Sequence, residues 1–161
     1  MKIIEYNKNY EEDVKDLLVE LEEYIISIDE DELDQIHNDY RDKIIELDLK
    51  EVYENEGKCL IAVDEFNKAI GVIMGIIRKY EEFDYLDYKC PKSGEITELV
   101  VSKKARSKGV GKHLMNSMQE YFKNKNCEYI FVDVFAYNKN AINFYSKDGY
   151  HSRMEIMVKK I

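Results

Sequence analysis

The residues with the clearest chemical potential form a run at positions 95–112, where a strand pattern leads through a short basic loop into a helix pattern. Gly109 and Gly111 open the helix pattern, and Arg106 stands three residues before the first of them. At a helix start several backbone N–H groups lack an intrahelical acceptor, and the helix dipole adds positive potential. Because glycine has no Cβ, an anion can approach the backbone closely. The run therefore predicts a site for a phosphate or pyrophosphate group.

Two common phosphate-binding motifs do not fit this run. The dinucleotide fingerprint requires a third glycine where Leu114 stands. The P-loop requires glycine at Arg106 and serine or threonine at His113. The pattern that remains is Arg-x-x-Gly-x-Gly directly after a strand.

A second pattern lies downstream of this one. Asn138, Ala141, Phe144 and Tyr145 follow the spacing Asn-x-x-Ala-x-x-Phe-Tyr, and the dipeptide 149–150 is Gly-Tyr. The two patterns, in this order and separated by a helix and a strand, resemble the signature of the GNAT superfamily of N-acetyltransferases. The clear resemblance covers residues 95–150. Lys103 and Ser107 depart from the residues usual in that signature, as does Tyr at position 150, but no group that the chemistry needs is lost.

The resemblance implies a fold and a cosubstrate. The fold would be a mixed α/β (α+β) GNAT-like domain spanning residues 1–161, with a single central mixed sheet flanked by helices on both faces. The cosubstrate would be acetyl-CoA, with its pyrophosphate on the N–H groups of residues 106–111 and its pantetheine arm paired with the strand at 99–101. A main-chain N–H of Leu99 or Val101 would polarise the thioester carbonyl. The residues predicted to contact the cosubstrate are Leu99, Val100, Val101, Arg106, Ser107, Lys108, Gly109, Val110, Gly111, Lys112, Asn138 and Tyr145.

Transfer of the acetyl group also needs an acid and a base. By its position in the second pattern, Tyr145 is the candidate general acid for the departing thiolate, because a phenol normally has a pKa near 10. Glu98 and Glu95 are the candidate general bases, with Glu98 preferred. They are three residues apart, so a regular strand would place them on opposite faces unless a bulge intervened. Asn138 is expected to cap the helix that follows it.

Hydrophobic periodicity predicts how the elements follow one another. Strands are expected over residues 2–7, 58–63, 69–77, 95–101, 129–134 and 154–159, and helices over residues 10–27, 39–53, 109–123 and 138–147. The inward face of the third helix comprises Val110, Leu114, Met115, Met118 and Phe122. Residues 129–134 are apolar on both faces except at Asp133, which favours a central strand covered on both sides.

Composition excludes several classes of function. A net charge of −9 disfavours nucleic acid as a partner. No apolar run approaches the roughly 20 residues of a membrane helix, and the polar N-terminus does not resemble a signal peptide. Cys59, Cys90 and Cys127 show neither CxxC spacing nor grouping with histidine, so we expect free thiols in a cytoplasmic protein and no metal.

The sequence thus predicts an acetyl-CoA-dependent N-acetyltransferase that acts by direct attack of a primary amine. The acceptor would be a small-molecule or peptide amine. Acidic segments at 11–32 and 81–87 suggest a cationic one, such as a polyamine, an aminoglycoside or a peptide amine. The alternative is a catalytically silent acyl-CoA-binding sensor or regulatory module. A homodimer is compatible with either function.

Overall fold

A computed structural model describes residues 1–161 of the chain. Its elements are β1 (Lys2–Glu5), α1 (Glu11–Ile28), α2 (Tyr40–Glu54), β2 (Lys58–Val63), β3 (Ala69–Ile77), β4 (Ser93–Val101), α3 (Val110–Asn124), β5 (Tyr129–Val132) and α4 (Lys139–Lys147), with the 3-10 helices η1 (Lys8–Tyr10), η2 (Asp84–Leu86) and η3 (Lys103–Ala105). The strands form one sheet in the order β1-β2-β3-β4-β5. All neighbours pair antiparallel except β4 and β5, which are parallel. The predicted mixed sheet is confirmed.

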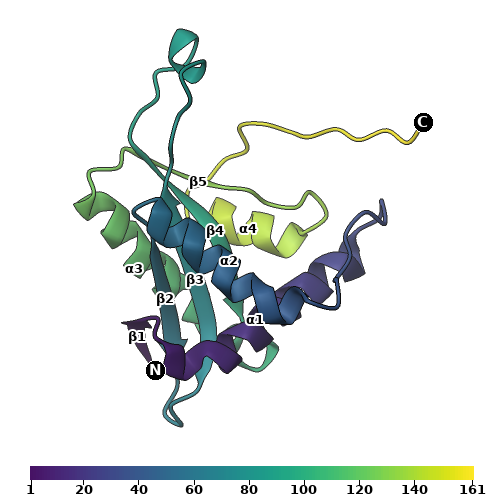
Figure 1. Cartoon of the computed structure of the whole chain (residues 1–161), viewed down its shortest axis with the longest axis vertical. Coiled ribbons are helices and arrows are strands. Elements are labelled where there is room, and N and C mark those ends of the chain that lie inside the picture. Colours follow the sequence, from purple (N-terminus) through teal and green to yellow (C-terminus); the bar gives the residue numbers. More distant parts are fainter.

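Helices cover both faces of this sheet (Figure 1). On one face, α1 and α2 pack on β2 and β3 through a buried cluster that includes Val14, Leu18 and Ile45. On the other face, the five inward residues predicted for α3 are all buried, and they pack with residues from β2, β3, β4 and α4. The prediction agrees with the structure because the large apolar residues of α3 recur at strict helical spacing. They form a single apolar face, and burial of that face away from water is favourable.

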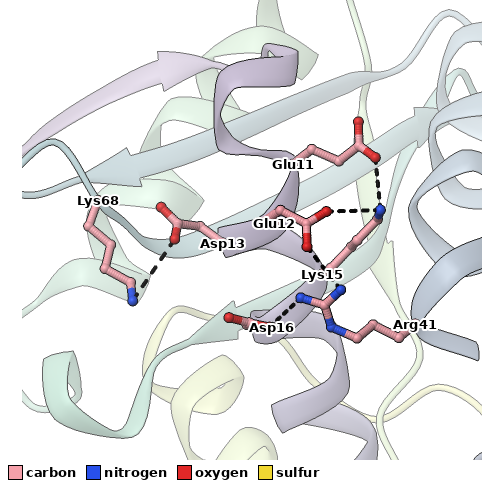
Figure 2. A network of polar contacts seen from close by, with 7 residues as sticks. All are labelled: Glu11, Glu12, Asp13, Lys15, Asp16, Arg41 and Lys68. Carbon is pink, nitrogen blue, oxygen red and sulfur yellow. Dashed lines mark hydrogen bonds and ion pairs between the residues drawn. The ribbon is translucent and has the colours of Figure 1, made fainter.

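Polar contacts fix how α1 meets α2 (Figure 2). The Arg41 guanidinium, near the start of α2, donates to Glu12 at 3.0 Å and to Asp16 at 2.7 Å, both on α1. Between these two residues of α1, the Asp13 carboxylate accepts from the backbone N–H of Ala69 at 2.9 Å and so ties α1 to β3. These contacts fix the relative orientation of α1 and α2. The same two helices bring carboxylates, Glu22 from α1 and Asp48 and Glu51 from α2, close to Glu98 of β4.

Two expectations about the end of the chain were wrong. Residues 129–134 are not a central strand, because β5 ends at Val132 and has β4 as its single neighbour, with Tyr129 58% exposed. Residues 154–159 form no strand, and nothing beyond Tyr150 makes a backbone hydrogen bond. Alternating apolar residues become a strand only where a neighbouring strand accepts them, and the chain in this structure does not lie beside one.

Smaller differences concern boundaries and one helix face. The first strand ends at Glu5, where η1 soon follows, and β4 begins at Ser93, two residues earlier than predicted. On α2, Leu47 is 60% exposed, whereas Ile45 and Val52 are buried. None of the helices combines the length and the apolarity that crossing a bilayer demands.

Candidate active site

A β-bulge in β4 shapes the centre of the site. Met74 of β3 pairs with Glu98, and the next residue, Gly75, pairs with Ile96, so Thr97 is an extra residue in β4. Directly paired residues share a face of the sheet, and Met74 and Ile76 both lie in the cluster beneath α1 and α2. Glu98 opposite Met74 and Glu95 opposite Ile76 therefore share the α1/α2 face. The bulge overrides the two-residue alternation that would have separated them.

Beyond the bulge, β4 and β5 part. Their pairing ends at Ile96 and Val132, and a cavity of about 250 Å³ occupies the gap. Its walls come from α1, β4, the chain leaving β5, and α4: Leu21, Glu22, Ile25, Ile96, Thr97, Glu98, Leu99, Val132, Asp133, Val134, Phe135, Asn138, Ala141 and Tyr145. Four sequence-predicted residues, Glu98, Leu99, Asn138 and Tyr145, thus meet in one place.

The backbone of β4 is free on the side of this gap. The Ser102 N–H donates to Ile70 of β3 at 3.0 Å, so the Ser102 amide points towards β3. Successive residues of a strand point their backbone groups to opposite sides, which directs those of Val101 and Leu99 to the gap. The Val101 carbonyl accepts from the Arg106 Nε at 3.0 Å, in keeping with this direction. The Leu99 and Val101 amides therefore face the opening between β4 and β5, where an extended ligand can pair with them.

At the end of β4 the chain forms a cradle of backbone donors. None of the backbone N–H groups of residues 106–112 has an acceptor within the protein, and the first amide of this region that is bonded is that of His113, to the Gly109 carbonyl. Ser107 (φ 62°) and Gly109 (φ 79°) are left-handed, which turns the chain into α3. Consecutive free amides at a helix N-terminus form an anion site.

The lack of a side chain matters for different reasons at Gly109 and Gly111. Gly109 needs its positive φ, which L side chains rarely adopt. At Gly111 a Cβ would meet Phe144 and Val101 at 3.6 Å, an ordinary van der Waals contact. The protein itself therefore tolerates a methyl group at position 111. The absence of a Cβ there matters only to something that approaches the helix start from outside.

The basic side chains of the cradle have separate surroundings. Arg106 is held by its bond to Val101 and by an ion pair with Glu20 of α1 at 3.2 Å, so it joins the loop to α1. Lys112 pairs with Asp148 at the end of α4. Lys108 is exposed, and no ion pair involves it, which leaves it available to an anion on the amides.

Glu98 lies in electrostatic surroundings that oppose its charge. Burial, with further contributions from Asp48, Glu22 and Glu51, raises the pKa of Glu98 to about 8. The last three belong to α1 and α2, so both helices bring negative charge to this carboxyl. A carboxyl with such a pKa exchanges its proton close to neutral pH, as a general base requires.

Glu95 is differently placed. Burial raises its pKa, but Arg78 opposes the shift through an ion pair of 3.5 Å. Glu95 does not line the cavity, whereas Glu98 does. Of the two candidate bases, the structure therefore places Glu98, and not Glu95, at the cavity.

Tyr145 of α4 is 8% exposed and lines the cavity opposite β4. Its ring packs edge-on against Phe144 and Tyr150, at centroid distances of 5.3 and 5.5 Å. Burial, with Tyr150 and Glu98 adding to it, raises the pKa of Tyr145 above its ordinary value. The ring packing therefore fixes the Tyr145 side chain at the cavity wall. Asn138 caps α4, since its side chain accepts from the Ala141 N–H at 3.0 Å.

Sequence reasoning missed the carboxylates that surround Glu98. Glu22 and Asp133 line the cavity. Burial, with help from Glu51, raises the pKa of Asp48 to about 6, and its Oδ2 is buried without a hydrogen-bond partner. The acidic stretch 11–32 contains Glu22, but the stretch 81–87 lies in the loop that projects from the sheet between β3 and β4 (Figure 1), and none of its residues lines the cavity. Only the folded arrangement of α1 and α2 distinguishes these acids from those on the surface.

Comparison with known proteins agrees with this geometry. Residues 17–150 match the sequence model of the Acetyltransferase (GNAT) family. An uncharacterised N-acetyltransferase of Methanocaldococcus jannaschii is 37% identical over 62 residues, which are 38% of this chain and 40% of that protein. This chain therefore matches less than half the length of that curated relative.

Solved structures show the same fold. A mutant of the BH1408 protein from Bacillus halodurans superposes with a TM-score of 0.84 at 19% identity, covering 100% of this chain and 99% of that one. An aminoglycoside N-acetyltransferase in complex with CoA superposes with a TM-score of 0.69 at 18% identity, covering 99% and 98% of the two chains. The sequence match extends over most of the chain and includes β4, the amide cradle and α4. The chain therefore belongs to the GNAT family of acetyltransferases.

Proposed function

We propose that this protein transfers an acetyl group from acetyl-CoA directly to a cationic primary amine. The observation that carries the proposal is the meeting of three features at one gap in the sheet. These are the free amides of residues 106–112, the outward-facing amides of Leu99 and Val101, and the cavity that holds Glu98 and Tyr145. Each feature supplies a different requirement of the transfer.

The cradle would hold the diphosphate of the cosubstrate, with Lys108 adding charge. The pantetheine arm would pair with the open side of β4 and bring the thioester to the cavity. There the Leu99 N–H would donate to the thioester carbonyl oxygen and stabilise the oxyanion as it forms. The pairing with β4 and the stabilisation of the oxyanion use backbone groups, so neither depends on which side chains β4 carries.

The proton transfers would run between Glu98 and Tyr145. Glu98 takes a proton from the acceptor ammonium, and the neutral amine attacks the carbonyl carbon. As the new C–N bond forms and the C–S bond breaks, Tyr145 gives its proton to the departing thiolate. The nitrogen of the product then loses its second proton to solvent. Glu98 also releases to solvent the proton that it took, and the Tyr145 phenolate regains one from solvent, so both side chains return to their starting states. No acyl-enzyme is needed.

The charge around the cavity supports a cationic acceptor. Glu22, Glu98 and Asp133 line it, and no basic side chain does. Asp48 and Glu51 add negative charge from α2. A low-dielectric recess surrounded by carboxylates concentrates cations and disfavours anions. A polyamine, an aminoglycoside or a peptide amine would meet this requirement, and an acidic or phosphorylated amine would not.

Thiol release tests the proposal. The protein is incubated with acetyl-CoA and a panel of polyamines, aminoglycosides, lysine peptides and anionic amino sugars, and free CoA is followed over time. We expect turnover with members of the cationic set and none with the anionic set. Binding of acetyl-CoA without turnover on any amine would instead identify a silent acyl-CoA sensor. Location in the cytoplasm remains a prediction that fractionation of cells would test.

A further inference from the structure

The second half of α1 lines the cavity without being anchored in the core. Every buried residue of α1 precedes position 19, and residues 19–28 are at least partly exposed. Yet Leu21, Glu22 and Ile25 of this second half form one wall of the cavity. Because burial of an apolar face supplies most of what holds a helix in place, this stretch of α1 depends on other contacts for its position.

Glu20, at the start of this half, ties it to the chain that leads into the amide cradle. One oxygen of its carboxylate, Oε1, accepts from the backbone N–H of Lys103 at 2.8 Å and from Nη2 of Arg106 at 3.2 Å. Lys103 begins η3, directly after β4, and Arg106 is the first residue of the free amides 106–112. Hydrogen bonds to an ionised acceptor are stronger than neutral ones. The Glu20 carboxylate therefore joins one cavity wall to the site predicted for the diphosphate.

Tyr24 continues this line of contacts to α4. Glu20 and Tyr24 are four residues apart and so lie on the same side of α1. The Arg106 guanidinium lies over the Tyr24 ring, 5.8 Å from its centroid, and the Tyr24 hydroxyl accepts from Nδ2 of Asn140 at 3.3 Å. Asn140 belongs to α4, which also lines the cavity. Polar contacts from the cradle and from α4 thus hold the part of α1 that the core does not hold.

We propose that Glu20 is a positioning residue that couples occupancy of the cradle to the placement of the α1 wall. The inference rests on the proposed function, because it takes the diphosphate of CoA as the occupant. Glu20 itself does not line the cavity, and it acts through Lys103 and Arg106. Glu22 lies two residues further along the same turn, so a loose α1 would misplace a carboxylate that faces the cationic acceptor.

Arg106 can bond to the occupant and to Glu20 at the same time. Its Nε donates to the Val101 carbonyl and its Nη2 to Glu20, whereas Nη1 has no acceptor within the protein. A guanidinium carries five N–H donors in a fixed plane, so Nη1 remains for a phosphate oxygen. A diphosphate on the amides of residues 106–112 would fix the backbone that carries this guanidinium. Its positive charge would also lie between two anions that otherwise repel each other.

Amide hydrogen exchange, followed by mass spectrometry with and without saturating CoA, tests the coupling. In the wild type, CoA should slow exchange at residues 20–28 at least about fivefold, the lower end of typical coupling between sites, and leave residues 11–18 unchanged. In Glu20→Ala this slowing should disappear, although calorimetry still detects bound CoA. Alanine is the best helix former, so the change removes the carboxylate and keeps the helix. The matched control Glu23→Ala, at an exposed residue that no ion pair involves, should keep the slowing.

Lys103→Pro removes the same contact from its other side. Proline lacks the backbone N–H, and it is tolerated at the first position of a helix, which Lys103 occupies in η3. The preceding Ser102 is extended (φ −47°, ψ 137°), as the residue before a proline must be. We expect Lys103→Pro to reduce the slowing at residues 20–28 while thermal melting stays close to that of the wild type. The double variant with Glu20→Ala should show no further loss, because both changes remove one contact.

Three outcomes would overturn the inference and leave the proposed function intact, because CoA binds in all of them. The first is bound CoA that leaves exchange at residues 20–28 of the wild type unchanged. The second is a slowing that persists in both Glu20→Ala and Lys103→Pro. The third is exchange that becomes faster in Glu20→Ala by the same factor with and without CoA, which would show that Glu20 only stabilises the helix. Failure of CoA to bind to the wild type would instead refute the proposed function, and this inference with it.

Discussion

Replacement of Glu98 by glutamine tests whether the carboxylate itself acts as the base, because the rest of the site is left unchanged. The change keeps the size of the side chain and removes its ability to take a proton. The proposed mechanism requires the ionised form of Glu98, and burial together with Asp48, Glu22 and Glu51 raises its pKa to about 8. Activity that depends on this group must therefore rise with pH through that value, because the base works when it is deprotonated.

The size of the effect follows from that pKa. At pH 7 about one molecule in eleven has an ionised Glu98, and at pH 9 about ten in eleven do, so the contribution of the base rises about tenfold over this interval. The acceptor amine also loses protons over the same interval. The ratio of wild-type kcat/KM to that of Glu98→Gln cancels this second titration. The ratio should reach about 10²–10⁴ at pH 9, the usual range for general-base catalysis.

The assay is thiol release over pH 6.5–9.5 with saturating acetyl-CoA and the best cationic acceptor. The matched control is Glu95→Gln, which removes a carboxylate from the same face of β4 but from outside the cavity, where Arg78 pairs with it. We expect the control to retain most of the activity and the same rise with pH. A wild-type to Glu98→Gln ratio that stays flat across the series would refute the role of Glu98, even if the variant were slow.

Three further changes test the remaining parts of the site. Tyr145→Phe should lower kcat and leave the Kd for acetyl-CoA, measured by calorimetry, almost unchanged. An acyl donor with a better leaving group than CoA should restore activity, because such a leaving group does not need a proton from Tyr145. Gly111→Ala should weaken acetyl-CoA binding at least about tenfold while thermal melting is almost unchanged, because the added methyl group meets only ordinary contacts within the protein. Asp48→Asn should move the rise of activity to lower pH, because it removes the negative charge that contributes most to the raised pKa of Glu98. The pKa of Asp48 in the folded state is about 6, above its ordinary value of 3.8, so the folded state binds the proton more tightly than the unfolded chain does. The free energy of unfolding of the wild type therefore falls as the pH rises between these two values. Urea unfolding at pH 4 and pH 8 should show that Asp48→Asn lacks the part of this fall that is due to Asp48.

The sequence was sufficient where local patterns decide structure. The helical spacing of Leu114, Met118 and Phe122 predicts α3 and its buried face, because a helix with one apolar face has a single way to bury it. Gly109 and Gly111 likewise locate the start of α3. The family resemblance then singled out Tyr145, and the position of Glu98 on the strand beside the expected thioester made it a candidate together with Glu95. Of these residues, Tyr145 and Glu98 meet at the cavity.

The sequence was insufficient where a long-range pairing decides structure. The bulge at Thr97 depends on the register between β3 and β4, and no residue type in β4 predicts it. Without it, the faces of Glu95 and Glu98 cannot be assigned. In the same way, Asp48 resembles any other acid of an amphipathic helix until α2 is seen to bring it near Glu98. The strand pattern at 154–159 is a further case, since a pattern does not show whether a neighbouring strand is there to pair with it.

The acids around Glu98 link acceptor binding to base strength. Without an acceptor, ionised Glu98 stands near Asp48 and Glu22, and this repulsion opposes its charge. A bound ammonium group lies among the same carboxylates and must favour their ionised forms, so it lowers the pKa of the base that is to take its proton. Thermodynamic linkage makes the effect reciprocal: if the cation favours ionised Glu98, then ionisation of Glu98 must strengthen binding of the cation. The affinity for a permanently charged acceptor analogue should therefore rise between pH 7 and pH 9 in the wild type, and it should be independent of pH over this range in Glu98→Gln. A quaternary ammonium analogue is suitable because it has no proton to lose, so any change in its Kd reports the protein alone.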